Sequence, residues 1–149
     1  GLHPYGIGVH RHAPEIEQEL GSRFKDDVVV TFTPHLVPMT RGELVTVYVE
    51  LADGESVSSL HETLTSRYAE EPFVRVRPMG AMPPDTRHVR GTNRCEISVH
   101  ADRNQKRAIV IGAIDNLVKG SAGQALQNIN LMFGFDETTN LSRLEPLFP

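Results

Sequence analysis

The chain alternates between stretches with the two-residue period of a half-buried strand and stretches with the spacing of an amphipathic helix. The period-two pattern predicts strands at 28–33, 44–51, 73–77, 95–101 and 106–114. The first two are expected to pair antiparallel. The last is almost continuously apolar, which favours a central position in the sheet. Together these elements predict an α+β fold with a mixed, mainly antiparallel sheet covered by helices.

Helical spacing appears in three stretches. Pro14 suits the first turn of a helix that carries Ile16, Leu20 and Phe24 on one face, and a second helix is predicted over 56–68. The third runs from about 116 to 133, with Asp115 as N-cap and Gly134 as C-terminal stop. It is expected to pack on the sheet through an apolar stripe of Val118, Ala122, Ala125 and Ile129.

Two glycines in the first half of this third helix, Gly120 and Gly123, each cost about 1 kcal/mol relative to alanine. Such a cost indicates that something approaches the helix backbone closely. A packed neighbouring helix would explain the glycines, and so would an anionic cofactor at the positive end of the helix. The spacing leaves both explanations open.

Composition and charge narrow the class of protein. With 149 residues, 39% hydrophobic and 23% charged, the chain suits one globular domain, and its net charge of −4 argues against a general nucleic-acid binder. No apolar run approaches the length of a membrane span, so a soluble cytoplasmic protein is expected. The single cysteine fits a reducing compartment. Because Cys95 falls on the apolar side of a predicted strand, we expect a structural thiol.

Candidate chemistry coincides with a helix start at 10–20. His12 follows His10 and Arg11 and precedes Pro14, so it is expected at the N-terminus of the helix, where the dipole disfavours an imidazolium. A neutral imidazole is what a general base needs. The alternative is a pair of surface histidines that flank a helix cap.

Four segments, in the same order, resemble the N-acetyl-gamma-glutamyl-phosphate reductases, NADPH-dependent enzymes of arginine biosynthesis. They are His-Arg-His-Ala-Pro-Glu-Ile-Glu-Gln-Glu-Leu at 10–20, Phe-Thr-Pro-His-Leu-Val-Pro-Met at 32–39 with Arg41 and Gly42, Gly-Thr-Asn-Arg-Cys-Glu-Ile at 91–97, and Asp-Asn-Leu-Val-Lys-Gly-Ser-Ala-Gly-Gln-Ala at 115–125. The resemblance implies that residues 1–149 form the C-terminal catalytic and dimerisation domain, similar to that of glyceraldehyde-3-phosphate dehydrogenase.

The resemblance also implies what the chain lacks. The family's cysteine nucleophile, in a Gly-Cys-Tyr-Pro-like motif, and its glycine-rich NADP loop do not occur in these 149 residues. We therefore expect the chain to be part of a larger reductase and to be inactive alone. The stretch 141–149 is expected to contact the nucleotide-binding domain.

In the family, the cysteine attacks the acyl phosphate, and hydride passes between NADP(H) and a thioester or thiohemiacetal. The resemblance assigns the acid/base role to His12, with Glu15 beside it. It implies substrate binding by His10, Arg11, Arg41 and, more loosely, Tyr5, and cofactor binding by Asn116, Lys119 and Gly120, with no metal. Arg11 and Arg41 suit phosphate or carboxylate because a guanidinium is a planar fork, but surface salt bridges are the alternative.

The implied partners are N-acetyl-gamma-glutamyl phosphate, N-acetylglutamate semialdehyde and phosphate, in a homo-oligomer, dimer or tetramer. No nucleic acid or membrane partner is expected. Two other functions stay open at this point. One is the homologous aminoadipate-type reductase of lysine biosynthesis, and the other is a non-catalytic dimerisation module that keeps the fold.

Overall fold

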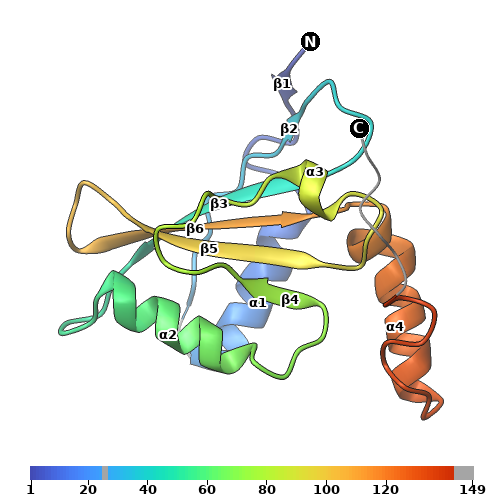
Figure 1. Cartoon of the computed structure of the whole chain (residues 1–149). Helices are drawn as coiled ribbons and strands as arrows, with labels where there is room; N and C mark the ends of the chain where they lie inside the picture. Colours follow the sequence, from blue (N-terminus) through green and yellow to red (C-terminus); the bar gives the residue numbers. More distant parts are fainter. Residues whose placement is uncertain (25–26, 143–149) are drawn as a thin grey trace. The chain divides into compact units, whose positions relative to one another are not determined.

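The computed structural model describes residues 1–24 and 27–142, which divide into two compact units, 1–40 and 41–149. Figure 1 shows the course of the chain. The first unit has fewer residues than the roughly 50 of a small domain, so the prediction of one domain over 1–149 stays a prediction. In residues 1–24 and 27–142, no helix combines the length and apolar character needed to cross a membrane.

The first unit is a helix with a small two-stranded ladder. Helix α1 (His12–Phe24) begins two residues before Pro14, close to the predicted start. Strand β1 (His3–Pro4) pairs antiparallel with β2 (His35–Leu36), and Tyr5 N–H extends this pairing by donating to the Pro34 carbonyl. Ile16 and Leu20 of the predicted stripe are half-buried, whereas Phe24 is exposed.

The prediction of a strand at 28–33 is wrong. Burial does alternate there, with Val28, Val30 and Phe32 half-buried and their neighbours exposed, but residues 28–33 form no strand. A strand requires a ladder partner, and among the described residues 28–33 has none, although the expected partner, at 44–51, is an edge strand. The Val30 N–H instead donates to the Glu17 side chain (2.8 Å). Of the predicted turn before this stretch, Asp26 lies outside the described residues.

The second unit is built on a four-stranded sheet of order β3-β6-β5-β4. The strands are β3 (Glu43–Glu50), β4 (Val74–Val76), β5 (Cys95–Ala101) and β6 (Arg107–Ile114). β6 pairs antiparallel with β3 and β5, whereas β4 runs parallel to β5. The predicted mixed, mainly antiparallel sheet is confirmed, as is the inner position of the apolar strand.

A helix covers part of this sheet. α2 (Val57–Arg67) lies against β4 and β5 (Figure 1). It starts with a capping box, because the Ser56 hydroxyl accepts from the Ser59 N–H and the Ser59 hydroxyl accepts from the Ser56 N–H. A short helix, α3 (Thr86–Val89), interrupts the proline-rich connection, with Asp85 as its N-cap.

The predicted third helix exists but buries the opposite face. It consists of a π-helical turn, η1 (Val118–Ala122), and α4 (Gly123–Met132). Its buried residues are Gly123, Gln127 and Asn130. Of the predicted stripe, Val118 is half-buried and Ala122, Ala125 and Ile129 are exposed. α4 extends away from the end of the sheet in Figure 1. The predicted packing through the apolar stripe is therefore wrong.

The reason is a polar contact. The Asn93 side chain donates to Gln127 Oε1 (2.9 Å), which also accepts from Lys119 Nζ (2.9 Å), and Asn130 donates to the carbonyls of Glu137 and Thr139. Buried polar groups must keep hydrogen bonds, so the polar face turns inward. The close approach inferred from the glycines is a loop side chain, because a Cβ on Gly123 would overlap Asn93 Oδ1.

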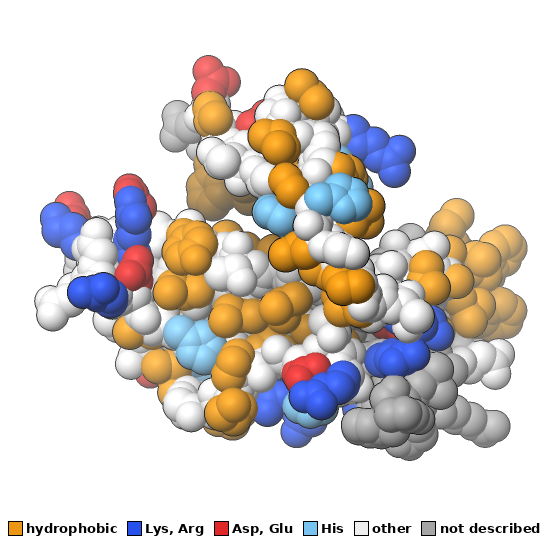
Figure 2. Space-filling view, turned by 90° about the horizontal axis from the view of Figure 1, so that it is seen from above, with side chains coloured by type: hydrophobic (Ala, Val, Ile, Leu, Met, Phe, Trp, Pro, Cys, Tyr) orange, Lys and Arg blue, Asp and Glu red, His pale blue; other side chains and the backbone are white. Residues whose placement is uncertain are grey.

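Much apolar surface of the second unit stays uncovered. On the edge strand β3, Leu44, Val45, Val47 and Tyr48 are 39–67% exposed, and Met132 and Phe133 at the end of α4 are 79% and 71% exposed. Figure 2 shows apolar side chains gathered over the sheet. Patches of this kind mark interaction surfaces in soluble proteins.

The two helix glycines differ in what an added methyl group would meet. Gly123→Ala should destabilise the protein by about 1–3 kcal/mol, because the new Cβ overlaps Asn93 and Val118 in a closely packed place. Gly120→Ala is the matched control: its Cβ meets Ile114 Cδ1 at 3.4 Å, so the change should be neutral or stabilising by up to about 1 kcal/mol. Urea unfolding of both variants measures this, and equal losses would contradict it.

Candidate functional site

The first unit gathers three of the predicted residues around one aromatic cluster. The His10 ring packs against Tyr5 (5.3 Å between centroids), His12 (4.6 Å) and Phe32 (5.2 Å). His10 Nδ1 also accepts a hydrogen bond from the His12 backbone N–H (3.2 Å). His10 therefore takes part in starting α1, and the exposed His12 ring lies against it at the first residue of the helix.

Glu15 and Arg11 do not join this cluster. Both are exposed, and in the described residues no hydrogen bond or ion pair connects Glu15 with His12. Glu15, predicted beside His12, therefore makes no polar contact with its ring in the part of the chain that the structure describes, whereas the His10 ring does contact that of His12. Their assigned roles in catalysis and substrate binding stay predictions. His35, on β2, bonds through Nδ1 to the Thr33 carbonyl (3.2 Å).

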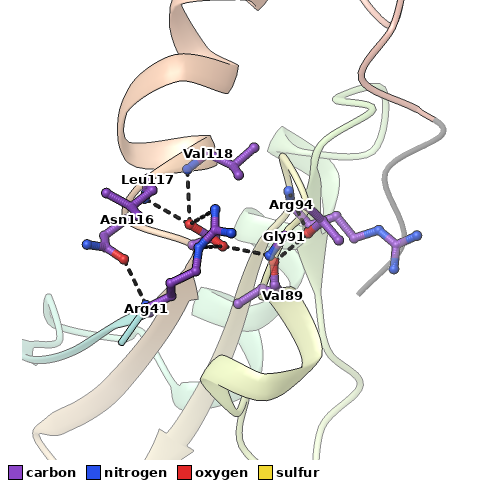
Figure 3. A network of polar contacts seen from close by, with 10 residues as sticks. Arg41, Val89, Gly91, Arg94, Asn116, Leu117 and Val118 are labelled. Atoms are coloured by element: carbon purple, nitrogen blue, oxygen red, sulfur yellow. Dashed lines mark hydrogen bonds and ion pairs between the residues drawn. The ribbon is translucent and has the colours of Figure 1, made fainter. Parts of the chain in front are cut away.

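The second unit has its own polar centre, the buried carboxylate of Asp115. Oδ1 accepts from the backbone N–H groups of Leu117 (2.8 Å) and Val118 (3.0 Å), as predicted for a helix N-cap. Oδ2 accepts from the Gly91 N–H (2.6 Å). Figure 3 shows these groups around the carboxylate. The side chain is inaccessible to solvent.

Arg41 completes the centre. Its Nε lies 3.1 Å from Asp115 Oδ2, and its Nη2 donates to Oδ1 (3.3 Å). Next to it, the Gly42 N–H donates to Asn116 Oδ1 (2.8 Å). Gly42 has φ +112°, and an added Cβ would lie 2.7 Å from Thr86 Cβ, so a side chain there would be both strained and blocked. The structure therefore brings the predicted residues Arg41 and Asn116 together.

Asp115 stays ionised in this setting. Burial by itself raises the pKa of its carboxyl, but the hydrogen bonds from Gly91, Leu117 and Val118 and the charge of Arg41 outweigh it, so the net pKa is lowered. A buried carboxylate is tolerated only with such compensation.

Lys119 and Gly120, predicted at the cofactor, lie on η1. The Lys119 ammonium donates to Gln127 and lies over the Phe73 ring at 5.7 Å. Its pKa is lowered by burial, although Cys95, Glu137 and Glu71 act in the opposite direction. Gly120 is exposed, and its N–H donates to the Asp115 carbonyl (3.0 Å).

Cys95 behaves as a structural thiol. It is half-buried at the start of β5, and burial raises its pKa, with Lys119 lowering it and Glu96 raising it further. A raised pKa disfavours the thiolate that a nucleophile requires. In residues 1–24 and 27–142, no group of three or more His, Cys, Asp or Glu side chains is arranged to hold a metal ion.

Sequence reasoning identified Asp115 only as a helix cap and missed its partner Gly91 and the buried Asn93 and Gln127. Gly91 and Asn93 do lie in the segment 91–97 that carries the family resemblance. Their partners are 24 and 34 positions away along the chain. A local pattern of polarity holds no information on such distant pairs.

The ionised Asp115 should make stability depend on pH. Because its pKa is lowered on folding, the carboxylate stabilises the fold above its ordinary pKa of 3.8, and this contribution is lost as pH falls below that value. Asp115→Asn should cost about 3 kcal/mol at pH 7, since Arg41 loses its counter-charge. The difference between variant and parent should shrink below pH 3.8 in urea unfolding.

Asp85→Asn is the control. The pKa of Asp85 is lowered to about 2 by its hydrogen bond and charge pair with Arg87, but Arg87 is exposed, so the loss should stay within about 1 kcal/mol. A loss at Asp115 no greater than at Asp85, or one that persists at low pH, would contradict the role of the buried charge.

Comparisons with known proteins agree with this fold. Residues 1–116 match the model of a family described as semialdehyde dehydrogenase, dimerisation domain. Aspartate semialdehyde dehydrogenase II from Vibrio cholerae has a similar fold, with a TM-score of 0.65 at 20% identity over 83% of this chain and 37% of that one. This confirms the predicted fold class.

Among curated relatives, two proteins called N-acetyl-gamma-glutamyl-phosphate reductase match the whole chain. The one from Rhodospirillum rubrum is 53% identical and the one from Geobacter metallireducens 54%, and the chain covers 42% and 43% of them. A probable chloroplastic reductase of that name from Arabidopsis thaliana is 52% identical, with 37% covered. The chain thus spans about two fifths of these relatives' length, and it belongs to the semialdehyde dehydrogenase dimerisation-domain family.

Proposed function

We propose that this chain is the catalytic and dimerisation part of an NADPH-dependent N-acetyl-gamma-glutamyl-phosphate reductase of arginine biosynthesis. The observation that carries the proposal is identity of 49–54% over at least 99% of the chain with bacterial relatives of that name. The exposed apolar residues of β3 support assembly into an oligomer. The cysteine nucleophile then belongs to the part of the relatives' length that this chain does not span.

His12 is the proposed acid and base. Its exposure leaves the imidazole accessible to a reacting group, and the contact with His10 limits its rotation. His12 would take the proton of the thiol as it attacks the acyl phosphate and phosphate leaves. It would then give a proton to the thioester oxygen as hydride addition forms the thiohemiacetal, and take it back when the thiolate leaves and the aldehyde forms. Its role needs no contact with Glu15.

Arg41 is the better supported of the two anion-binding candidates. One hydrogen bond from Nη2 and the ion pair with Asp115 orient its guanidinium before an anion arrives. Arg11 is exposed on the first unit, where no contact orients its guanidinium within the described part of the chain. A preoriented fork is what bidentate recognition of phosphate or carboxylate requires.

NADP(H) is the proposed cofactor, and when bound it supplies the hydride. Asn116 fits a role in holding it: since Gly42 N–H faces the amide oxygen, the amide nitrogen is left as a donor with no partner among the described residues. The exposed Gly120 permits close approach to the backbone. Lys119 fits less well because Gln127 and Phe73 already engage its ammonium.

The acid/base proposal predicts a rate effect. In the complete reductase, His12→Asn should lower kcat by about 10²–10⁴-fold, the range typical of a general acid or base, with little change in affinity for NADP. His35→Asn is the control and should do less, because that side chain bonds a backbone carbonyl. Comparable losses at both positions, or a change confined to KM at His12, would remove His12 from this role.

A second prediction concerns the chain by itself. Supplied with N-acetylglutamate semialdehyde, phosphate and NADP, residues 1–149 alone should give no NADPH, because Cys95 is unsuited as a nucleophile. Absorbance at the reduced cofactor's wavelength measures turnover. Turnover by the chain alone would refute the proposed division of labour. If the complete protein turned over the aminoadipate homologue but not this substrate, the lysine-pathway reductase would be favoured. If it turned over neither substrate, a dimerisation module would be favoured.

A further inference from the structure

Asp115 connects three segments that are far apart in the sequence. Its carboxylate contacts Arg41 before β3, Gly91 after α3, and the start of η1 through Leu117 and Val118 (Figure 3). A helix cap needs only the last of these contacts. The carboxylate therefore does more than start a helix, and the contact that requires explanation is the one with Arg41.

The contact uses only one edge of the guanidinium. Asp115 accepts one hydrogen bond from Nη2 and lies within ion-pair distance of Nε, which makes no hydrogen bond, whereas a guanidinium carries five N–H donors. The Arg41 side chain is 24% exposed, although Asp115 is wholly buried. The Arg41 side chain is thus accessible in part, and the guanidinium donors that Asp115 does not use remain for a solute oxyanion.

The pair also keeps positive potential on that outer edge. A carboxylate that touched only Arg41 would cancel its charge, but Asp115 receives three backbone N–H donors as well. These donors share in stabilising the negative charge. An anion on the far side of the guanidinium therefore meets a cation whose counter-charge is buried and partly compensated.

We propose that Asp115 is a positioning residue for substrate recognition, which holds the Arg41 guanidinium so that its outer edge binds an oxyanion of the substrate. The inference rests on the proposed function and deepens it. The oxyanion is either the phosphoryl group that is transferred or the carboxylate of the N-acetylated amino acid. Because Gly42 bonds Asn116, the same turn also ties Arg41 to the residue proposed at the cofactor.

A purely structural ion pair is the alternative, and the same unit contains a matched example. Arg77 bonds Glu96 (2.6 Å), and their side chains are 23% and 6% exposed, close to the 24% and 0% of Arg41 and Asp115. Glu96 lies within β5, and its ion-pair partner is Arg77 and not Arg41. Glu96→Gln therefore reproduces the loss of a buried counter-charge without touching Arg41.

The test is a double-mutant cycle in the complete protein, with Asp115→Asn, Arg41→Gln, the double variant and Glu96→Gln. KM is measured separately for phosphate and for N-acetylglutamate semialdehyde in the NADP-reducing direction. Asp115→Asn and Arg41→Gln should each raise one of these constants by about tenfold, and the double variant should raise it no further. The substrate whose KM rises identifies the oxyanion. Glu96→Gln should leave both within about twofold.

Binding keeps the inference testable if the reductase assay fails. Calorimetric titration with inorganic phosphate and with N-acetylglutamate should show weaker binding of one of them in Asp115→Asn and unchanged binding in Glu96→Gln. That result without turnover would sink the proposed function and support the positioning role.

Three outcomes would overturn the inference: additive effects in the cycle, equal effects from Glu96→Gln, or a change only in KM for NADP. Should Asp115→Asn fail to fold, Arg41→Lys decides, since it keeps the charge and loses the planar fork. An unchanged KM for both substrates in Arg41→Lys would then reject the proposal, and a roughly tenfold rise in one would support it.

Discussion

The second unit depends on burying the charge of Asp115. Moving a carboxylate out of water is costly unless hydrogen bonds and a counter-charge replace its hydration. In this protein, Arg41, Gly91 and the residues at the start of η1 replace the hydration of the carboxylate. The turn before β3, the turn after α3 and the helix start must therefore meet at Asp115. A single charged side chain thereby fixes the geometry of three loops that regular hydrogen bonding between strands leaves undetermined.

The same requirement for polar partners explains the helix that follows. η1 and α4 are held by Gln127 and Asn130, whose amides bond to Asn93, Lys119 and backbone carbonyls, and not by an apolar seam. The apolar side of α4 then remains outside, with Met132 and Phe133 among the most exposed side chains. The family match ends at residue 116, just before this helix. α4 is thus held by directional polar bonds to the loop before β5, to η1 and to the segment that follows it, while its apolar side stays exposed.

Hydrophobic periodicity predicted the secondary structure correctly wherever a local pattern is enough to determine it. The alternation along β3 and β5 and the continuous apolar run of β6 predicted the sheet and its inner strand. Asp115 was predicted as the N-cap; its carboxylate does accept from the N–H groups of Leu117 and Val118, but the N-cap residue of η1 is Leu117. The stretch 28–33 has the same β-branched composition, yet it has no ladder partner among the described residues, and the expected partner pairs only with β6. Strand formation depends on a second segment, and composition reports only on the first.

The buried face of the helix at 116–133 was predicted wrongly for a related reason, since an apolar stripe predicts the buried face only if burial is driven by apolar contact. Asn93, 34 positions from Gln127, reverses that preference by offering a hydrogen bond that an exposed amide would otherwise make with water.

The two polar centres also show why candidate catalytic and positioning groups look different in a structure. A group that exchanges protons with substrate must be accessible, and His12 is exposed at the first residue of α1 with its backbone and ring face engaged by His10. A group that orients another must keep one charge state and one position, and Asp115 achieves both by full burial and a lowered pKa. Sequence motifs reveal the proton-exchanging groups more readily, because histidines and glycines form short recognisable patterns. The second kind is an ordinary aspartate whose importance comes from partners 24 and 74 positions away.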